Sequence, residues 1–414
     1  MKKDIAGAGP ESTTPVFEVL ESLVREQAQV FIQQILEEEV TELLGRGKSQ
    51  RREAADAPAG YRNGHGKPRK LTMSSGTITL RRPRVREVDE AFESRVLPLF
   101  AKRTREVGHL IPELYLHGLA EGDFELALRG LLGEGAPLSK ATIRRMKVGW
   151  AAEFEAWSRR PLEGREVVYV WADGIYVKAG LERDKAALLV VIGAMSDGTK
   201  EVLAVTSGYR ESTQSWTAVF RGLMARGLGE PRLLVADGNP AIWAAAAQVW
   251  PGAEEQRCWN HKMRNVLDRL PKREQADAKE LLRAIAYAPS QAEALEAREA
   301  FEKRYRPWYP KAVDILEDDW ERMVAFYGFP ESHWRHMRTT NVVESPFAAV
   351  RLRTSAAKRF KRVENATALI WKLLTVAEKK FRKLDAPHQL KDVFEGRKFE
   401  DGKPVSTDRR KEAA

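Results

Sequence analysis

The stretches VVYVWADGIYV (167–177), AALLVVIGAM (186–195) and EVLAVTSGY (201–209) decide the fold. Each run is rich in Val, Ile, Leu or Tyr and is bounded by polar or glycine residues, as core β-strands are. A helical pattern follows at 215–227, and then come a fourth buried strand within PRLLVADGNP (231–240), a helix at 241–250 and a short strand near EEQRCW (254–259). Three strands in a meander, followed by helix, strand, helix and strand, predict a mixed sheet with helices on its faces, which is an α/β core.

Two acids occupy matching places in this predicted sheet. Asp173 follows the strand VVYVWA and Asp237 follows the strand RLLVA, and a glycine comes directly after each. A carboxylate at the carboxyl end of a core strand lies at the rim where ligands bind in α/β folds, and the glycine leaves the approach open. The alternative is a turn-forming Asp-Gly pair after each strand. From these residues alone the two interpretations stand side by side.

Glu344 is the third candidate acid. The Thr-Thr-Asn stretch at 339–341 precedes an apolar-periodic segment, so Thr340 or Asn341 is expected to cap a helix whose first turn contains Glu344. The alternative role is an acid that faces the helix dipole. Three carboxylates without a Cys or His cage suit a hard ion such as Mg²⁺ or Mn²⁺. Two such ions, about 4 Å apart, would clamp the attacking and leaving oxygens of a phosphodiester.

Cys258 and His261 form the element CWNH just after the last predicted strand. A structural zinc site needs four ligands, and the chain has no second cysteine, so we expect no zinc here. The residues by themselves indicate a buried thiol and a histidine at the start of a helix.

The composition limits the class of protein. Lys and Arg outnumber Asp and Glu by 69 to 59, giving a net charge of +10 that favours a polyanionic partner, most commonly nucleic acid. One cysteine excludes an intramolecular disulfide and indicates a reducing cytoplasm. No run of about 18 apolar residues is present, so we expect a protein that neither enters nor contacts a membrane.

The N-terminal third differs from the predicted core in composition and in the spacing of its apolar residues. Residues 1–14 are expected to form a flexible tail, and apolar residues at helical spacing over 16–44 predict one or two amphipathic helices for self-association or domain packing. Residues 45–86 are rich in Gly, Arg and Lys, and Gly76–Arg84 predicts one short strand. This segment fits a solvated basic loop and a phosphate-tracking surface equally well. Its candidate DNA-binding residues are Arg62, Arg81, Arg82 and Arg84.

Residues 123–150 consist of two apolar-periodic pieces joined by a Gly/Pro turn, and Ser139 is a plausible N-cap of the second piece. This pattern fits a helix-turn-helix whose second helix enters the major groove, although any helical hairpin can imitate it. The candidate DNA-binding residues of this element are Lys140, Arg144, Arg145 and Lys147.

Taken in order, the motifs WADGIYV, VADGNPAI, RCWNHKMRNV and RTTNVVES resemble the Mutator-type transposases of bacterial insertion sequences. The resemblance extends upstream through YRNGH and LSKATIRRM and downstream through GFPESHWRHMRTTN, so that it covers roughly residues 15–385. It implies a ribonuclease-H-like core with an Asp, Asp, Glu triad, a C-x-x-H element after the second acid, and a helical insertion before the glutamate. Asp173, Asp237 and Glu344 match the triad, and Cys258 and His261 match the C-x-x-H element.

The resemblance also implies an organisation of the chain. An N-terminal region at 15–160 would bind DNA and oligomerise. The core would begin at 161–261, be interrupted by a helical insertion at 262–335, and be completed at 336–385 by the segment with the catalytic glutamate. Residues 386–414 would form a C-terminal tail. The basic run after Glu344 adds Arg351 and Arg353 as candidate DNA contacts.

By this resemblance the protein would bind the terminal inverted repeats of its element, cut a phosphodiester with two Mg²⁺ or Mn²⁺ ions, and transfer the strand. Its partners would be double-stranded DNA and further copies of itself, and it would be cytoplasmic and associated with the nucleoid. His261 would support the catalytic centre and Cys258 would pack as a small hydrophobe. Two other classes remain open, a non-catalytic DNA-binding regulator and a nuclease that cuts without joining.

Overall fold

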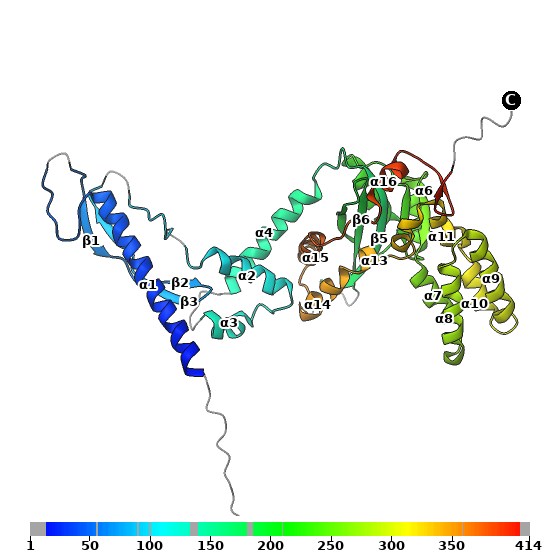
Figure 1. Cartoon of the computed structure of the whole chain (residues 1–414), viewed down its shortest axis with the longest axis horizontal. Coiled ribbons are helices and arrows are strands. Elements are labelled where there is room, and N and C mark those ends of the chain that lie inside the picture. The colour runs from blue at the N-terminus through cyan, green and yellow to red at the C-terminus, as the bar shows by residue number, and fades with distance from the viewer. Residues whose placement is uncertain are drawn as a thin grey trace, which may run out of the picture. The chain divides into compact units, whose positions relative to one another are not determined.

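The computed structural model describes residues 14–405 except 55–56, 89–90, 99–100, 133–139, 180–184, 209 and 358. The chain divides into two compact units, Met1–Met146 and Lys147–Ala414 (Figure 1). Among the helices of the described residues, none is both long enough and apolar enough to cross a bilayer.

The first unit is built on one long helix, α1 (Thr14–Leu44), where the sequence allowed one or two. One face of α1 is buried through Leu36 and Val40, and Leu36 packs with Leu80 and other apolar residues of the strands that follow. On another face Phe31 is 62% exposed. Burial of one apolar stripe therefore holds α1 on its unit.

Four short strands follow α1. β1 (Tyr61–His65) pairs antiparallel with β4 (Pro83–Arg86), and β2 (Arg69–Met73) pairs antiparallel with β3 (Gly76–Leu80). The prediction of one strand over Gly76–Arg84 is therefore wrong, because the ladder breaks at residues 81–82. There Gln33 of α1 binds both the N–H and the C=O of Arg81, and Pro83 has no N–H to continue a ladder.

Three helices complete this part of the chain: α2 (Arg105–Leu116), α3 (Phe124–Leu132) and α4 (Lys140–Ser158). The boundary between the two units falls inside α4. The pieces α3 and α4 coincide with the predicted helical pair, whereas the joining residues, including the predicted N-cap Ser139, lie outside the described residues.

The second unit contains the predicted mixed α/β core. Its sheet has the order β7-β6-β5-β8-β9, in which β6 is antiparallel to β5 and β7, while β8 and β9 run parallel to β5. The strands are β5 (Val167–Val177), β6 (Ala186–Met195), β7 (Lys200–Gly208), β8 (Leu233–Ala236) and β9 (Glu254–Arg257).

Two helices cover one face of this sheet. α5 (Thr213–Ala225) and α6 (Pro240–Val249) pack their buried side chains, Trp216 and Ile242 among them, against Val170 and Ala172 of β5. Ser212 caps α5 and Asn239 caps α6 through side-chain oxygens that accept backbone N–H groups. These caps fix the loops that enter the two helices.

Helices fill the span between β9 and the segment of Glu344, and α8, α9 and α10 lie side by side in Figure 1. Arg257, buried at the end of β9, pairs with Asp319 at 2.6 Å and ties this helical part to the sheet. The elements are α7 (Trp259–Leu267), α8 (Lys272–Ala286), α9 (Gln291–Tyr305), α10 (Pro310–Glu317), α11 (Trp320–Val324), η1 (Ala325–Gly328) and η2 (Glu331–His333).

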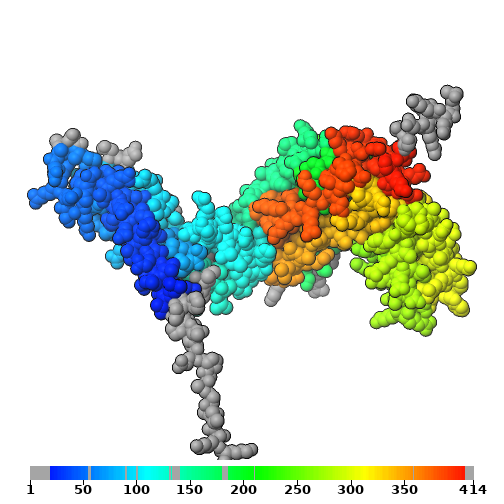
Figure 2. All heavy atoms as spheres, in the orientation of Figure 1, coloured from blue at the N-terminus to red at the C-terminus, as the bar shows by residue number. Residues whose placement is uncertain are grey.

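The chain then returns to the sheet through α12 (Trp334–Met337), α13 (Asn341–Glu344), α14 (Phe347–Ala357) and α15 (Val363–Glu378). Residues 386–405, predicted as part of a tail, instead form α16 (Pro387–Phe394) and a hairpin of β10 (Phe399–Glu400) and β11 (Lys403–Pro404). Gly402 exchanges backbone hydrogen bonds with Tyr327 and Glu331, and Figure 2 shows this red segment on the second unit. The expected tail is thus corrected over this range.

Candidate active site

The sheet brings Asp173 and Asp237 together. Parallel pairing of β5 and β8 sets Trp171 opposite Val235, so each acid comes two residues beyond this pair on its own strand. The structure corrects one detail, because β5 does not end before Asp173. The strand continues to Val177, and Asp173 pairs with Val190 of β6. Asp173 therefore lies just beyond the point where β8 stops pairing with β5, while β5 itself continues.

Glu344 approaches from the face opposite α5 and α6. Side chains alternate along a strand, so Tyr169, Trp171 and Asp173 share that face. The Tyr169 hydroxyl lies 2.9 Å from Nδ1 of His333, and Trp171 Nε1 donates to the carbonyl oxygen of His336. These contacts fasten the chain before α13 along β5, and α13 itself packs on β5 and β6. Glu344, at the end of α13, therefore lies near Asp173.

The electrostatics agree with this convergence. Burial, and then the nearby carboxylates of Asp237 and Glu344, raise the pKa of Asp173 to about 7, against the lowering effect of the Gly174 N–H, which donates to Oδ1 at 2.7 Å, and of His261. Asp173 thus keeps its proton more readily because it is partly removed from water and has two like charges as neighbours.

His261 lies in the first turn of α7, beside Glu344. Its Nε2 is 3.4 Å from Oε1 of Glu344. The adjacent Cys258 and then Glu344 and Asp237 raise the pKa of His261 to about 9, in opposition to burial. A protonated His261 would therefore place one positive charge among the acids.

Cys258 is fully buried between this site and α13. Its sulfur accepts hydrogen bonds from the N–H and the hydroxyl of Thr340, at 3.4 and 3.3 Å. Thr340 is the N-cap residue of α13, as expected, but its side chain binds Cys258 and does not cap the helix. The thiol thus joins the start of α7 to the start of α13.

The donor set fits a hard divalent cation. Asp173, Asp237 and Glu344 present carboxylate oxygens, and a cation among them would offset the repulsion that raises the pKa of Asp173. Across the part of the chain that the structure describes, however, no three His, Cys, Asp or Glu side chains are already arranged as a metal-ion site. The three acids are neighbours, and Glu344 is also paired with His261.

Sequence reasoning missed Glu211, which precedes α5. Its carboxylate accepts a hydrogen bond from Nδ2 of Asn239 at 2.8 Å, and the backbone N–H of Asn239 donates to Oδ1 of Asp237 at 2.9 Å. Burial raises the pKa of Glu211. No strand or repeated acid-glycine pattern marks this residue in the sequence, so only the fold could reveal it.

The predicted DNA-binding residues separate into two groups. Six of them have exposed side chains, and among these Arg144 lies 3.7 Å from Glu121 and Arg351 stacks on Phe347. Arg145 lines a hollow of about 320 Å³ together with Arg103. Burial lowers the pKa of Arg103 and the charge of Arg145 lowers it further. The exposed six are Arg81, Arg84, Lys140, Arg144, Arg145 and Arg351.

The other four candidate DNA-binding residues have side chains that are less accessible to DNA. Arg62 binds Glu37 and Thr41 of α1, and Arg82 binds the carbonyl oxygen of Phe92. Lys147 is half-buried. Arg353 is only 3% exposed within α14. Its helix turns that side chain inward, so a contact between Arg353 and DNA stays a prediction that this arrangement does not favour.

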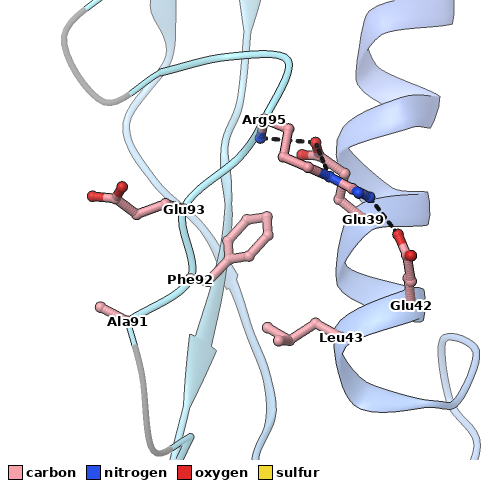
Figure 3. A pocket seen from close by; sticks show the side chains of 7 residues that line it. All are labelled: Glu39, Glu42, Leu43, Ala91, Phe92, Glu93 and Arg95. Carbon is pink, nitrogen blue, oxygen red and sulfur yellow. Dashed lines mark hydrogen bonds and ion pairs between the residues drawn. The ribbon is translucent and has the colours of Figure 1, made fainter.

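A larger hollow of about 590 Å³ lies in the first unit between α1 and residues 91–95 (Figure 3). Arg95 pairs with Glu42 at 2.5 Å, and the backbone N–H of Arg95 donates to Glu39. Three glutamates line this hollow, which makes it a poor place for phosphate, and none of the three triad acids belongs to it.

The chain is similar in sequence to curated transposases of bacterial insertion sequences. The transposase for insertion sequence element IS6120 of Mycolicibacterium smegmatis is 41% identical over 297 residues, which are 72% of this chain and 92% of that protein. The transposase for IST2 of Acidithiobacillus ferrooxidans is 41% identical over 282 residues, 68% of this chain and 95% of that protein. The Drosophila P element transposase strand transfer complex covers 70% of this chain and 91% of its own, but at 10% identity and a TM-score of 0.23 it is too remote to establish a shared fold.

The family model described as Transposase, Mutator family, matches residues 11–383, a span that includes all five residues of the triad and the C-x-x-H element. The chain therefore belongs to the Mutator family of transposases.

Proposed function

We propose that this protein binds the terminal inverted repeats of an insertion sequence and carries out metal-dependent cleavage and transfer of DNA strands. The observation that carries the proposal is the convergence of Asp173, Asp237 and Glu344 at one opening of the sheet. Its relatives are named transposases of insertion sequence elements. We infer a ribonuclease-H-like core, which the three-stranded meander followed by two parallel strands supports.

In the proposed reaction Asp173 and Asp237 hold the site from rigid strands, while Glu344 contributes the third carboxylate from a helix. Bound by these acids, two Mg²⁺ or Mn²⁺ ions would supply the charge that activates the attacking oxygen and stabilises the leaving oxygen. His261 holds Glu344 near the aspartates before the site is filled. A hard, oxygen-only donor set favours these ions over zinc.

The exposed basic residues of the first unit and of α4 are proposed to track the DNA backbone, in keeping with the net charge of +10. Because two element ends must meet, we propose a homodimer or larger assembly on DNA. Such a protein would act at the nucleoid in the cytoplasm.

The decisive experiment uses end-labelled DNA that carries the flanking element ends, with and without Mg²⁺, together with an unlabelled target. Nicked or cut ends and labelled target, both dependent on Mg²⁺, are expected. Cleavage without labelled target would favour a nuclease that does not join. Binding without any cleavage would favour a non-catalytic regulator.

A further inference from the structure

Glu211 occupies a position that the triad does not account for. It lies in the connection between β7 and α5, and its side chain crosses the backbone of Gly174, the residue after Asp173. A Cβ built on Gly174 would fall 1.7 Å from Oε1 of Glu211. Glycine is therefore required at 174 for the glutamate to lie where it does.

Two donors hold this carboxylate. Asn239 donates to Oε2 at 2.8 Å, and the hydroxyl of Tyr176 is hydrogen-bonded to the same side chain. Tyr176 belongs to β5, whereas Asn239 belongs to the loop between β8 and α6. The glutamate thus bridges the two chain segments that carry Asp173 and Asp237.

Glu211 contacts β5 on the face of the sheet opposite the Asp173 side chain, which favours a supporting role over that of a metal ligand. Gly174 and Tyr176 alternate with Asp173 along β5, so they face the side of α5 and α6, while Asp173 faces α13. Glu211 therefore contacts the segments of the site from the α5 and α6 face of the sheet, opposite the Asp173 side chain. The backbone N–H of Asn239 reaches Oδ1 of Asp237 at 2.9 Å, which completes a path from Glu211 to the second catalytic acid.

We propose that Glu211 is a positioning residue that fixes the spacing of Asp173 and Asp237 by bridging β5 to the Asn239 loop. This inference rests on the proposed metal-binding function of the two aspartates. Partners beyond the first ligands of a metal ion commonly change its affinity by about 10-fold to 100-fold. Glu211 acts through shape and hydrogen bonds, so its charge is dispensable while its length and its accepting oxygen are not.

The test measures Mn²⁺ binding to the metal-free full chain by titration calorimetry without DNA, together with cleavage of labelled ends. Glu211→Ala is expected to weaken Mn²⁺ binding by about 10-fold to 100-fold. Glu211→Gln keeps an oxygen for Asn239 and is expected to bind Mn²⁺ nearly as the unaltered protein does. Asn239→Ser keeps a capping oxygen for α6 but loses the donor to Glu211, and it should reproduce the Glu211→Ala defect.

Glu254→Gln, at an exposed acid at the start of β9, is the matched control and should change neither measurement. Loss of Mn²⁺ binding in Glu211→Gln equal to that in Asp237→Asn would make Glu211 a ligand and overturn the inference. Unaltered binding in both Glu211→Ala and Asn239→Ser would overturn it as well. If Asp237→Asn itself bound Mn²⁺ normally, the proposed metal site would fail first, which separates the two failures.

Discussion

Nε2 of His261 lies 3.4 Å from Oε1 of Glu344, and this contact links α7, which directly follows the last strand of the sheet, to α13, which comes after the whole helical part. From the family resemblance, His261 is expected to support the catalytic centre. In the structure the partner of His261 is the carboxylate of Glu344. A histidine in this place can hold the carboxylate of Glu344 near the two aspartates.

Asp237→Asn should abolish strand cleavage and leave binding to the element ends close to the unaltered value. The change removes a carboxylate from the metal site but no contact to phosphate. Cleavage is measured on a denaturing gel, and binding by fluorescence anisotropy at one salt concentration. A correctly folded Asp237→Asn protein that bound the ends poorly would contradict this division of roles.

His261→Ala should lower the cleavage rate by about 10-fold to 100-fold, the range seen for partners that orient metal ligands. Without its ion pair, Glu344 loses one of the contacts that keep it beside Asp173. His117→Ala, in the first unit, serves as the matched control. Equal rates for His261→Ala and the unaltered protein under single-turnover conditions would remove His261 from the site.

Cys258→Ala should mainly cost stability, on the order of 1 kcal/mol, because it deletes a buried sulfur and leaves the Thr340 donors without an acceptor. Cys258→Ser, which keeps an accepting atom, should recover part of the loss. The free energy of unfolding is obtained from urea titrations followed by tryptophan fluorescence. Stoichiometric zinc in the purified protein that disappeared with Cys258→Ala, together with activity, would instead show a metal site.

Arg145→Ala should weaken DNA binding and reduce the salt dependence of the binding constant by about one phosphate contact. Arg144→Ala should have the smaller effect, since Arg144 already lies near Glu121. Arg103→Ala should resemble Arg145→Ala, because both side chains line the same hollow without an acidic side chain among its lining residues. The slopes come from anisotropy titrations at several salt concentrations, and a larger slope change for Arg144→Ala than for Arg145→Ala would contradict the assignment.

His336→Gln should make the protein less sensitive to acid between about pH 6.5 and 4. Burial, with a contribution from Lys200, lowers the pKa of His336 to about 4. The unfolded chain takes up a proton near pH 6.5 while the folded protein does not, so stability falls as the pH falls through this window. His388→Gln, at an exposed site, is the control. The unfolding free energies of both variants at pH 7 and pH 5 decide the point, and an equal loss in His336→Gln and the unaltered protein would exclude His336 as a cause.

Local sequence patterns predicted most of the strands of the α/β core. The apolar runs at 167–177, 186–195 and 201–209 predicted three strands and the meander, because a buried strand needs a continuous apolar run. The repeated strand-Asp-Gly pattern singled out Asp173 and Asp237. The capping residues before α13 placed Glu344 in a first turn. Each of these signals lies within a few residues, so the sequence could show it directly.

The sequence by itself therefore determined the α/β class and the strands, and it singled out the three acids as candidates. Only the tertiary structure decided that β5 continues past Asp173, that His261 pairs with Glu344, and that Glu211 bridges β5 and Asn239. It also buried Arg353 and folded residues 386–405 onto the second unit. The physical reason is that strand pairing and packing bring together residues far apart in the chain, and no local pattern encodes which distant partner a side chain meets.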